Sequence, residues 1–386
     1  MRIIRTADLK PGFVVGRALT DEKGNILLQQ GVELTQRYIQ ALETKGYNRL
    51  YVQDPDLGDD DIEPPEDLSP ATRAKAMLTL QRSFAEVAKQ LGTVKRQSFD
   101  ELLEACSSET ARVLMGSKGP LADMHEVANS ILNEALTHST LAGLTSMKSA
   151  DSHLYDHSID VCVTGIMIGR TVGLTNTRLR QLATGCLLHD IGMMFIDDKV
   201  SRTTKIHHHT RLGYELLKNN DDPDIMAPHV ALEHHERQDG SGLPRGLIGS
   251  NTIARDRSLR PPIPTLIGEI AAVADIYDIL LTGAANQDPM PPDMALNAIR
   301  QAAGTHLNRQ VVEAFLRVVP VYPQGMEIIV RSEYLHNYSG IVTKVNPTQL
   351  DRPVITLVRN NHGKAIPAIA IDLVDKTDMF IRCKGL

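Results

Sequence analysis

The stretch LATGCLLHDIG, residues 182–192, decides how this chain folds. Leu182, Cys186 and His189 are four and three residues apart, so in an α-helix they share one face and His189 points where the apolar side chains point. Asp190 follows His189 into the interior. Imidazole and carboxylate groups are metal ligands at neutral pH, and we therefore expect a helical domain built around a metal centre.

Two other segments offer ligands for the same metal. His157 begins a similar apolar face, and Asp275 directly follows the apolar run 271–274 on another predicted helix. One histidine, the His189-Asp190 pair and a distant aspartate can close around one divalent metal inside a helical bundle.

The remaining histidines suggest a second metal, since nine of the fourteen lie between His153 and His235. His209, His234 and His235, with a carboxylate shared from Asp190, would complete a second site. Two metals about 3.5 to 4 Å apart can activate a water and hold the attacking and leaving oxygens of a phosphodiester. His153 precedes His157 by one turn and is a candidate ligand for a third metal.

Alternative interpretations exist for each histidine taken alone, as a hydrogen-bonded core residue or a surface residue. The seven ligands taken together are harder to explain without a cation, because burying them would leave costly unsatisfied polar atoms. His207, His208 and His229 lack the register of the candidate ligands, and we expect them to be solvated.

Composition excludes several classes of protein. The net charge of −6 and the pI near 6.2 argue against a DNA-binding protein, which needs a basic face. No apolar run approaches the roughly 18 to 20 residues that span a bilayer, and the N-terminus lacks the apolar core of a signal peptide. We expect a cytoplasmic protein without a membrane segment, whose four scattered cysteines are core thiols.

The 386 residues exceed the usual size of a single core, and the expected fold class is mainly α. Between Asp54 and Asp67 there are eight carboxylates and three prolines, a composition typical of a linker. After Pro320, β-branched runs at 326–330, 340–345 and 354–358 predict strands. The predicted segments are a small α+β N-terminal module (1–53) with a helix over about 35–45, an acidic linker (54–68), a linking helix (69–98), an all-helical metal-binding domain (99–319) and a small β-rich C-terminal segment (320–386).

Within the linking helix, apolar residues repeat at spacings of three and four; these are Met77, Leu80, Phe84, Val87 and Leu91. Such a seam can pack on the following domain or join two copies into a homodimer, and both interpretations remain open.

Five segments, taken in order, resemble the HD-GYP family, a bacterial branch of the HD metal-dependent phosphohydrolases. They are His157-Ser158-Ile159-Asp160-Val161, His189-Asp190-Ile191-Gly192, His209-Thr210-Arg211-Leu212-Gly213, the run from His234-His235-Glu236 through Gly242-Leu243-Pro244, and Ala274-Asp275-Ile276-Tyr277-Asp278.

This resemblance implies an all-α domain with two metals, usually iron or manganese, and in some members a third. It also implies hydrolysis of cyclic di-GMP to pGpG or GMP. By position, the ligands common to HD enzymes match His157, His189, Asp190 and Asp275, and the ligands added in this branch match His209, His234 and His235. Asp190 matches the bridging ligand and, with His189, the catalytic pair.

The sequence departs from the family at several positions, some of which contact substrate phosphates in the family. Met193 stands where the family usually has lysine, and one helical turn after His189 we expect it to face the site. The defining Gly-Tyr-Pro is Gly242-Leu243-Pro244, and two usually basic positions are Ala284 and Gln287. Arg245 and Lys199 remain as candidate cations for substrate phosphate.

Three functions are therefore considered. The first is a phosphodiesterase that hydrolyses cyclic di-GMP, or a related dinucleotide such as cyclic GMP-AMP, with a metal-bridging hydroxide as nucleophile. The second is a catalytically weak or inactive sensor that binds metal and nucleotide and signals through protein partners, which would explain the lost cations. The third is oxygen chemistry at a di-iron site, which nothing else in the sequence favours.

Overall fold

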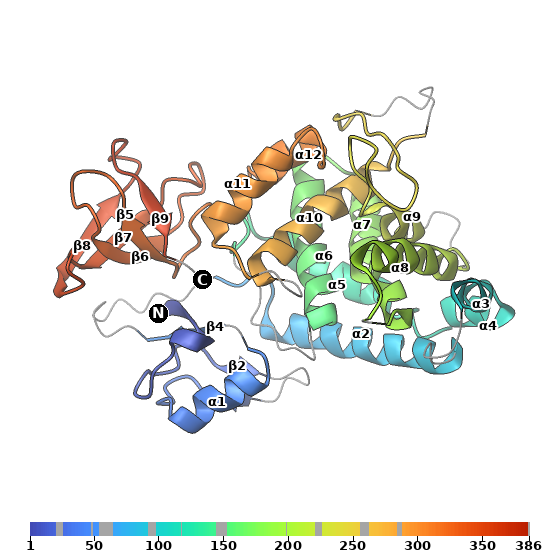
Figure 1. The fold of residues 1–386 in the computed structure, drawn as a ribbon, viewed down its shortest axis with the longest axis horizontal. Helices are drawn as coiled ribbons and strands as arrows, with labels where there is room; N and C mark the ends of the chain where they lie inside the picture. Colours follow the sequence, from blue (N-terminus) through green and yellow to red (C-terminus); the bar gives the residue numbers. More distant parts are fainter. Residues whose placement is uncertain are drawn as a thin grey trace.

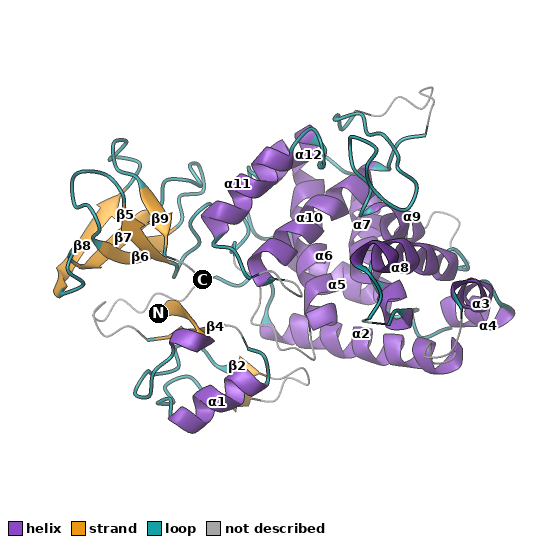
Figure 2. Ribbon diagram, in the orientation of Figure 1, coloured by secondary structure: helices purple, strands orange, loops and turns teal. Residues whose placement is uncertain are grey.

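The computed structural model describes residues 1–20, 26–47, 49–53, 65–91, 98–116, 118–143, 153–197, 199–220, 226–254, 262–283 and 288–384. Figure 1 shows a large helical body with two smaller units beside it, and Figure 2 shows that strands are confined to those two units. The predicted fold class is confirmed: the chain is mostly helical, with a small α+β N-terminal part and a β-rich C-terminal part. Most of the acidic linker, together with Ala284 and Gln287, lies outside the described residues.

The N-terminal module has its own hydrophobic cluster, which includes Val15, Leu34 and Leu50. Strands β1 (Arg2–Arg5) and β4 (Arg49–Val52) pair antiparallel, as do β2 (Leu19–Thr20) and β3 (Ile26–Leu28). The predicted helix is present as α1 (Gln36–Thr44), and the Thr35 side chain caps its first turn.

The linking helix is α2 (Pro70–Leu91), and the Ser69 hydroxyl accepts the backbone N–H of Thr72 at its start. All five residues of its apolar seam are buried in the core of the helical domain. Helix α2 packs on α5 (Met124–Ala135) and α6 (His153–Thr171). The seam therefore packs within the chain and is not available to join two copies.

The helices around the metal ligands approach closely because glycine lies at their contacts. A side chain at Gly165 of α6 would press on Cys186 of α7 (Asn176–Leu188), and one at Gly192 would collide with the carbonyl of His209. Gly192 thereby lets the 3-10 helix Ile191–Phe195 pack against α8. The further helices are α3 (Phe99–Cys106), α4 (Glu109–Met115), α8 (Arg202–Leu217), α9 (Ala227–Glu233), α10 (Leu266–Thr282), α11 (Pro292–Ala302) and α12 (Arg309–Phe315).

The C-terminal segment forms a five-stranded antiparallel sheet in the order β8-β7-β6-β5-β9. The three predicted strands are confirmed as β5 (Glu327–Val330), β6 (Ser339–Lys344) and β7 (Val354–Arg359). Two further strands were not predicted: β8 (Ala365–Asp372), a largely exposed edge strand, and β9 (Ile381–Cys383). Strand β9 has three residues, too few to show an alternating pattern, and it is ordered by pairing with β5.

Two further expectations concern single residue types and membrane segments. All four cysteines are buried thiols, as predicted. Among the described residues, no helix combines the length and the apolar character that crossing a membrane requires.

Candidate metal centre

The first group of candidate ligands lies where α6, α7 and α10 meet. His157 of α6, His189 at the end of α7 and Asp275 of α10 each offer a ligand atom, and these atoms lie within 4.8 Å of one another. His157 Nε2 is 3.1 Å from Asp275 Oδ1, and the three side chains are at most 5% exposed. We call these residues the first cluster.

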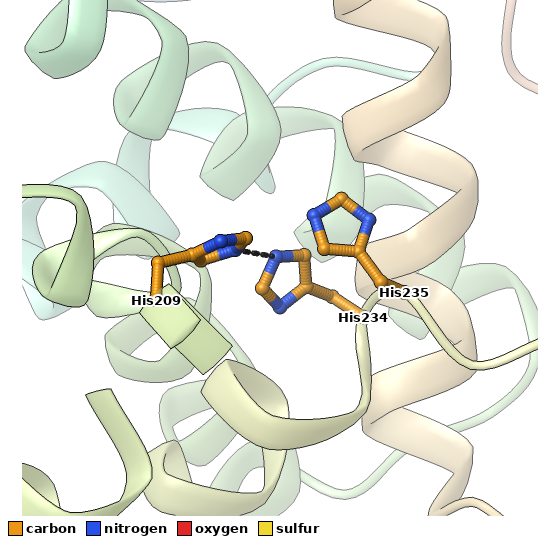
Figure 3. Close-up of side chains that lie close together, drawn as sticks. All are labelled: His209, His234 and His235. Atoms are coloured by element: carbon orange, nitrogen blue, oxygen red, sulfur yellow. Dashed lines mark hydrogen bonds between the residues drawn. The ribbon is translucent and has the colours of Figure 1, made fainter. Parts of the chain in front are cut away.

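The second group comes from α8 and from the chain that follows α9. His209, His234 and His235 offer ligand atoms that also lie within 4.8 Å of one another, and Figure 3 shows their rings turned toward a common space. His209 Nε2 is 3.2 Å from His234 Nε2. His209 and His234 are buried, whereas His235 is half-buried. We call these residues the second cluster.

Asp190 lies between the two clusters and presents one carboxylate oxygen to each. Its Oδ2 is 3.6 Å from His189 Nε2 and 4.0 Å from His157 Nε2. Its Oδ1 is 3.3 Å from His209 Nε2 and 3.7 Å from His234 Nε2. This is the placement that a carboxylate shared by two metals requires.

The imidazoles are held in the tautomer that metal ligation needs. His189, His209 and His234 each donate from Nδ1 to a backbone carbonyl three or four residues earlier, at 2.7, 2.7 and 3.0 Å. A carbonyl only accepts, so Nδ1 carries the hydrogen and a neutral ring presents the Nε2 lone pair to the cluster.

The residues present fit a bound cation in two ways. His209 Nε2 and His234 Nε2 face each other at 3.2 Å, where two lone pairs repel unless a proton or a metal lies nearby. His189 Nε2 and Asp275 Oδ2 are buried and lack a hydrogen-bond partner among the described residues. Unpaired buried polar atoms cost free energy, and a metal ion would satisfy both.

Protonation differs between the clusters. Burial alone would lower the pKa of His157, but its hydrogen bonds to Asp275 and Asp278 outweigh burial and raise that pKa to about 10. Burial also opposes ionisation of Asp275, yet the His157 contact lowers the pKa of Asp275 to about 2. In the second cluster, burial lowers the pKa of His209 to about 4 and that of His235 well below its usual range. Burial opposes protonation of His234 as well, but its contact with Asp190 raises the pKa of that ring above the usual value. Without metal, the first cluster therefore holds a proton on His157, whereas His209 and His235 of the second cluster are neutral.

Asp278 contacts a candidate ligand, and the sequence alone did not indicate this contact. Its Oδ2 accepts the Nδ1–H of His157 at 2.6 Å, so it fixes the ring orientation of a candidate ligand. In the sequence, Asp278 follows Asp275 by three residues, which predicts that both lie on the same face of α10. That spacing does not reveal that α6 packs against this face.

The turn containing Gly242-Leu243-Pro244 is fixed by a buried carboxylate. Glu236 accepts the backbone N–H groups of Arg245 at 2.8 Å and Leu247 at 2.9 Å. A side chain at Gly242 would collide with the backbone of Glu236. The turn therefore forms without the phenol that the family usually places at position 243.

The two candidate substrate cations lie in different settings. The guanidinium of Arg245 pairs with the buried carboxylate of Glu233, and its Nε is 3.9 Å from Glu236 Oε1. Lys199 is exposed, and its backbone N–H bonds Asp197. Their roles as substrate contacts stay predictions, as does the role of His153, which is exposed with its ring 6.2 Å from that of His157.

The structure corrects two expectations, one about Met193 and one about His207 and His208. Helix α7 ends at Leu188 and a 3-10 helix follows, so the argument that Met193 lies one α-helical turn beyond His189 does not hold. His208, expected in solvent, is half-buried with its ring stacked on Phe99 at 4.0 Å, and His207 is half-buried beside it. The helix ends where Asp190 turns between the two clusters.

Comparison with known proteins shows which families and relatives this chain resembles. Residues 154–280 match the family model of the HD domain. A cyclic di-GMP phosphodiesterase of Pseudomonas aeruginosa is 27% identical over 67% of this chain and 61% of its own length. The cyclic di-GMP phosphodiesterase response regulator RpfG of Xanthomonas campestris is 30% identical over 56% of each chain. The solved structure of Bd1817, an HDG"Y"P protein from Bdellovibrio bacteriovorus, matches with a TM-score of 0.38 and 14% identity over 81% of this chain and 97% of that one.

The His-Asp pair within the residues that match the HD domain is His189-Asp190. The predicted resemblance to the HD-GYP branch is confirmed, and Leu243 stands where that branch usually has tyrosine. The chain spans 61% and 56% of the length of the two curated relatives named above.

Proposed function

We propose that this protein is a metal-dependent phosphodiesterase that hydrolyses cyclic di-GMP to pGpG or GMP. The observation that carries the proposal is the position of Asp190, with one oxygen toward each of two histidine clusters. Its relatives named as cyclic di-GMP phosphodiesterases support the choice of substrate.

The donor set indicates which metals would bind. His157, His189 and Asp275 would hold one ion and the second cluster the other, with Asp190 shared. Mixed imidazole and carboxylate ligands suit iron or manganese. Two such ions, when bound, lower the pKa of a shared water and polarise the phosphate oxygens.

The protein's own residues contribute orientation and access. The Nδ1 hydrogen bonds of His189, His209 and His234 hold their rings with Nε2 inward before any ion arrives. The half-buried side of the second cluster, at His235, is where a phosphodiester can approach. Arg245 and Lys199 are the proposed cations for the second phosphate of a dinucleotide.

The test is hydrolysis by protein purified without oxygen and loaded separately with ferrous iron and with manganese. Cyclic di-GMP and cyclic GMP-AMP are each followed by chromatography, beside the variant Asp190→Ala. We expect linear product only when metal is present, and a loss of about 10² to 10³-fold in the variant, the range seen when one charge-stabilising group is removed. Intact nucleotide at full metal occupancy would refute the proposal.

A second candidate function is the weakly active or inactive sensor, which one observation favours. The Arg245 guanidinium is engaged by Glu233, so the cation nearest to the Gly242-Leu243-Pro244 turn is already neutralised. In that case the metal-loaded protein would bind cyclic di-GMP without turnover, as measured by calorimetry alongside the chromatography.

A further inference from the structure

Arg49 is a buried cation of the N-terminal module whose hydrogen bond leaves that module. It lies in β4, is 4% exposed, and donates from Nη2 to the carbonyl of Leu281 in α10 at 2.8 Å. The two residues are 232 positions apart in sequence. Burying a guanidinium costs free energy. Because the partner of Arg49 lies in another domain, we expect this side chain to have a specific structural role there.

Arg49 supplies a hydrogen-bond donor to a carbonyl at the C-terminal end of α10. The last carbonyls of a helix have no partner within it. Here the carbonyl of Ile279 accepts from Gly283 at 2.9 Å, that of Leu280 accepts from Met290 at 2.7 Å, and that of Leu281 accepts from Arg49. A cation at this end also interacts favourably with the helix dipole.

The same helix carries the carboxylates of the first cluster. Asp275, Asp278 and Leu281 follow one another at intervals of three residues, so they lie along neighbouring turns. Asp278 orients His157 through its 2.6 Å hydrogen bond. The charge of Asp278 also opposes the lowering of the Arg49 pKa by burial, which indicates that the two groups interact.

We propose that Arg49 is a positioning residue through which the docked N-terminal module sets the affinity of the first cluster for its metal. Arg49 holds the end of α10, α10 holds Asp278, and Asp278 holds the His157 ring. Separation of the module withdraws the cation and weakens the metal site, so an event in the module reaches the metal centre. The inference rests on the metal centre of the proposed function and not on its substrate.

The test is metal affinity measured on the full chain by competition between the protein and a chelator for manganese. We expect Arg49→Met to weaken metal binding at the first cluster about tenfold, the low end of the effect of losing an outer partner of a ligand. Arg49→Lys, which keeps the charge, should restore part of that loss. The matched control is Arg17→Met, which removes a cation of the same module that pairs with Glu66 at 2.9 Å.

A double-mutant cycle tests whether Arg49 acts on the metal site through Asp278. Asp278→Asn should weaken the same site, and combining it with Arg49→Met should weaken the site by less than the product of the two separate effects. An equal loss in Arg17→Met, or effects of Arg49→Met and Asp278→Asn that multiply, would overturn the proposal. Circular dichroism confirms folding, and Arg49→Gln replaces Arg49→Met if the latter does not fold. Failure of wild-type protein to hydrolyse cyclic di-GMP would defeat the proposed function and leave this affinity test unaffected.

Discussion

The first and second clusters share Asp190 but lie in different surroundings. The first combines two imidazoles with Asp275, has Asp278 behind His157, and is at most 5% exposed. The second consists of three imidazoles, and its member His235 is half-buried. The first cluster is closed and contains a carboxylate of its own, whereas the second has a half-buried side and consists of imidazoles alone.

This difference assigns different tasks to the two ions. Carboxylates in a closed site neutralise a dication, so the first cluster should hold its metal tightly. A catalytic metal needs an open position for water or substrate, and the second cluster provides the open side. The comparison predicts tight binding at the first cluster and weaker, exchangeable binding at the second.

Removing the second cluster should have the largest effect. Replacing His234 and His235 together with alanine should remove one metal equivalent. Hydrolysis should fall by about 10²-fold or more, since one of the two ions that act on the phosphodiester is lost. Elemental analysis and chromatography measure the two quantities. Unchanged metal content would refute the ligand assignment, and the double variant His207→Ala/His208→Ala is a control on the same number of neighbouring histidines.

Metal binding at the first cluster should depend on pH by about tenfold per pH unit. His157 has its pKa raised from 6.5 to about 10, so without metal it keeps its proton at neutral pH and must release it when the first ion binds. The affinity of the tighter site should therefore rise about tenfold per unit between pH 7 and 9. His209, with a pKa lowered to about 4, adds no such dependence there. A tighter site whose affinity is flat over this range would show that it is not the one containing His157.

The smallest expected effect is at Met193, half-buried in the turn that follows Asp190. Met193→Lys restores the cation usual in the family and should raise kcat/KM by up to about tenfold, which corresponds to about 1.4 kcal/mol. Met193→Gln is the uncharged control. Equal or lower turnover of the lysine variant at full metal loading would contradict a missing charge as the limit on rate.

Three candidate ligands could be located from the sequence because each lies on, or at the end of, an apolar helical face, where a polar side chain must point inward. His157, His189 and Asp275 were recognisable from their own helices, and the structure brings them together. The three β-branched runs likewise predicted β5, β6 and β7. The local sequence pattern was sufficient to predict the direction of a side chain wherever a single helix or strand determines that direction.

The sequence could not show what depends on packing between distant elements. The role of Asp278 requires α6 beside α10, and the contact of Arg49 with Leu281 joins residues 232 positions apart. The predicted position of Met193, one α-helical turn after His189, was wrong because α7 ends at Leu188. Strand β9 depends on its pairing with β5 and has no local pattern of its own.

The most direct test of the central claim is a crystal structure of manganese-loaded protein with anomalous scattering from the metal. We predict two peaks about 3.5 to 4 Å apart, one against each cluster, with Asp190 contacting both. Peak height should be greater at the first cluster when manganese is limiting. A single peak, or two peaks with Asp190 bound to only one, would contradict the account.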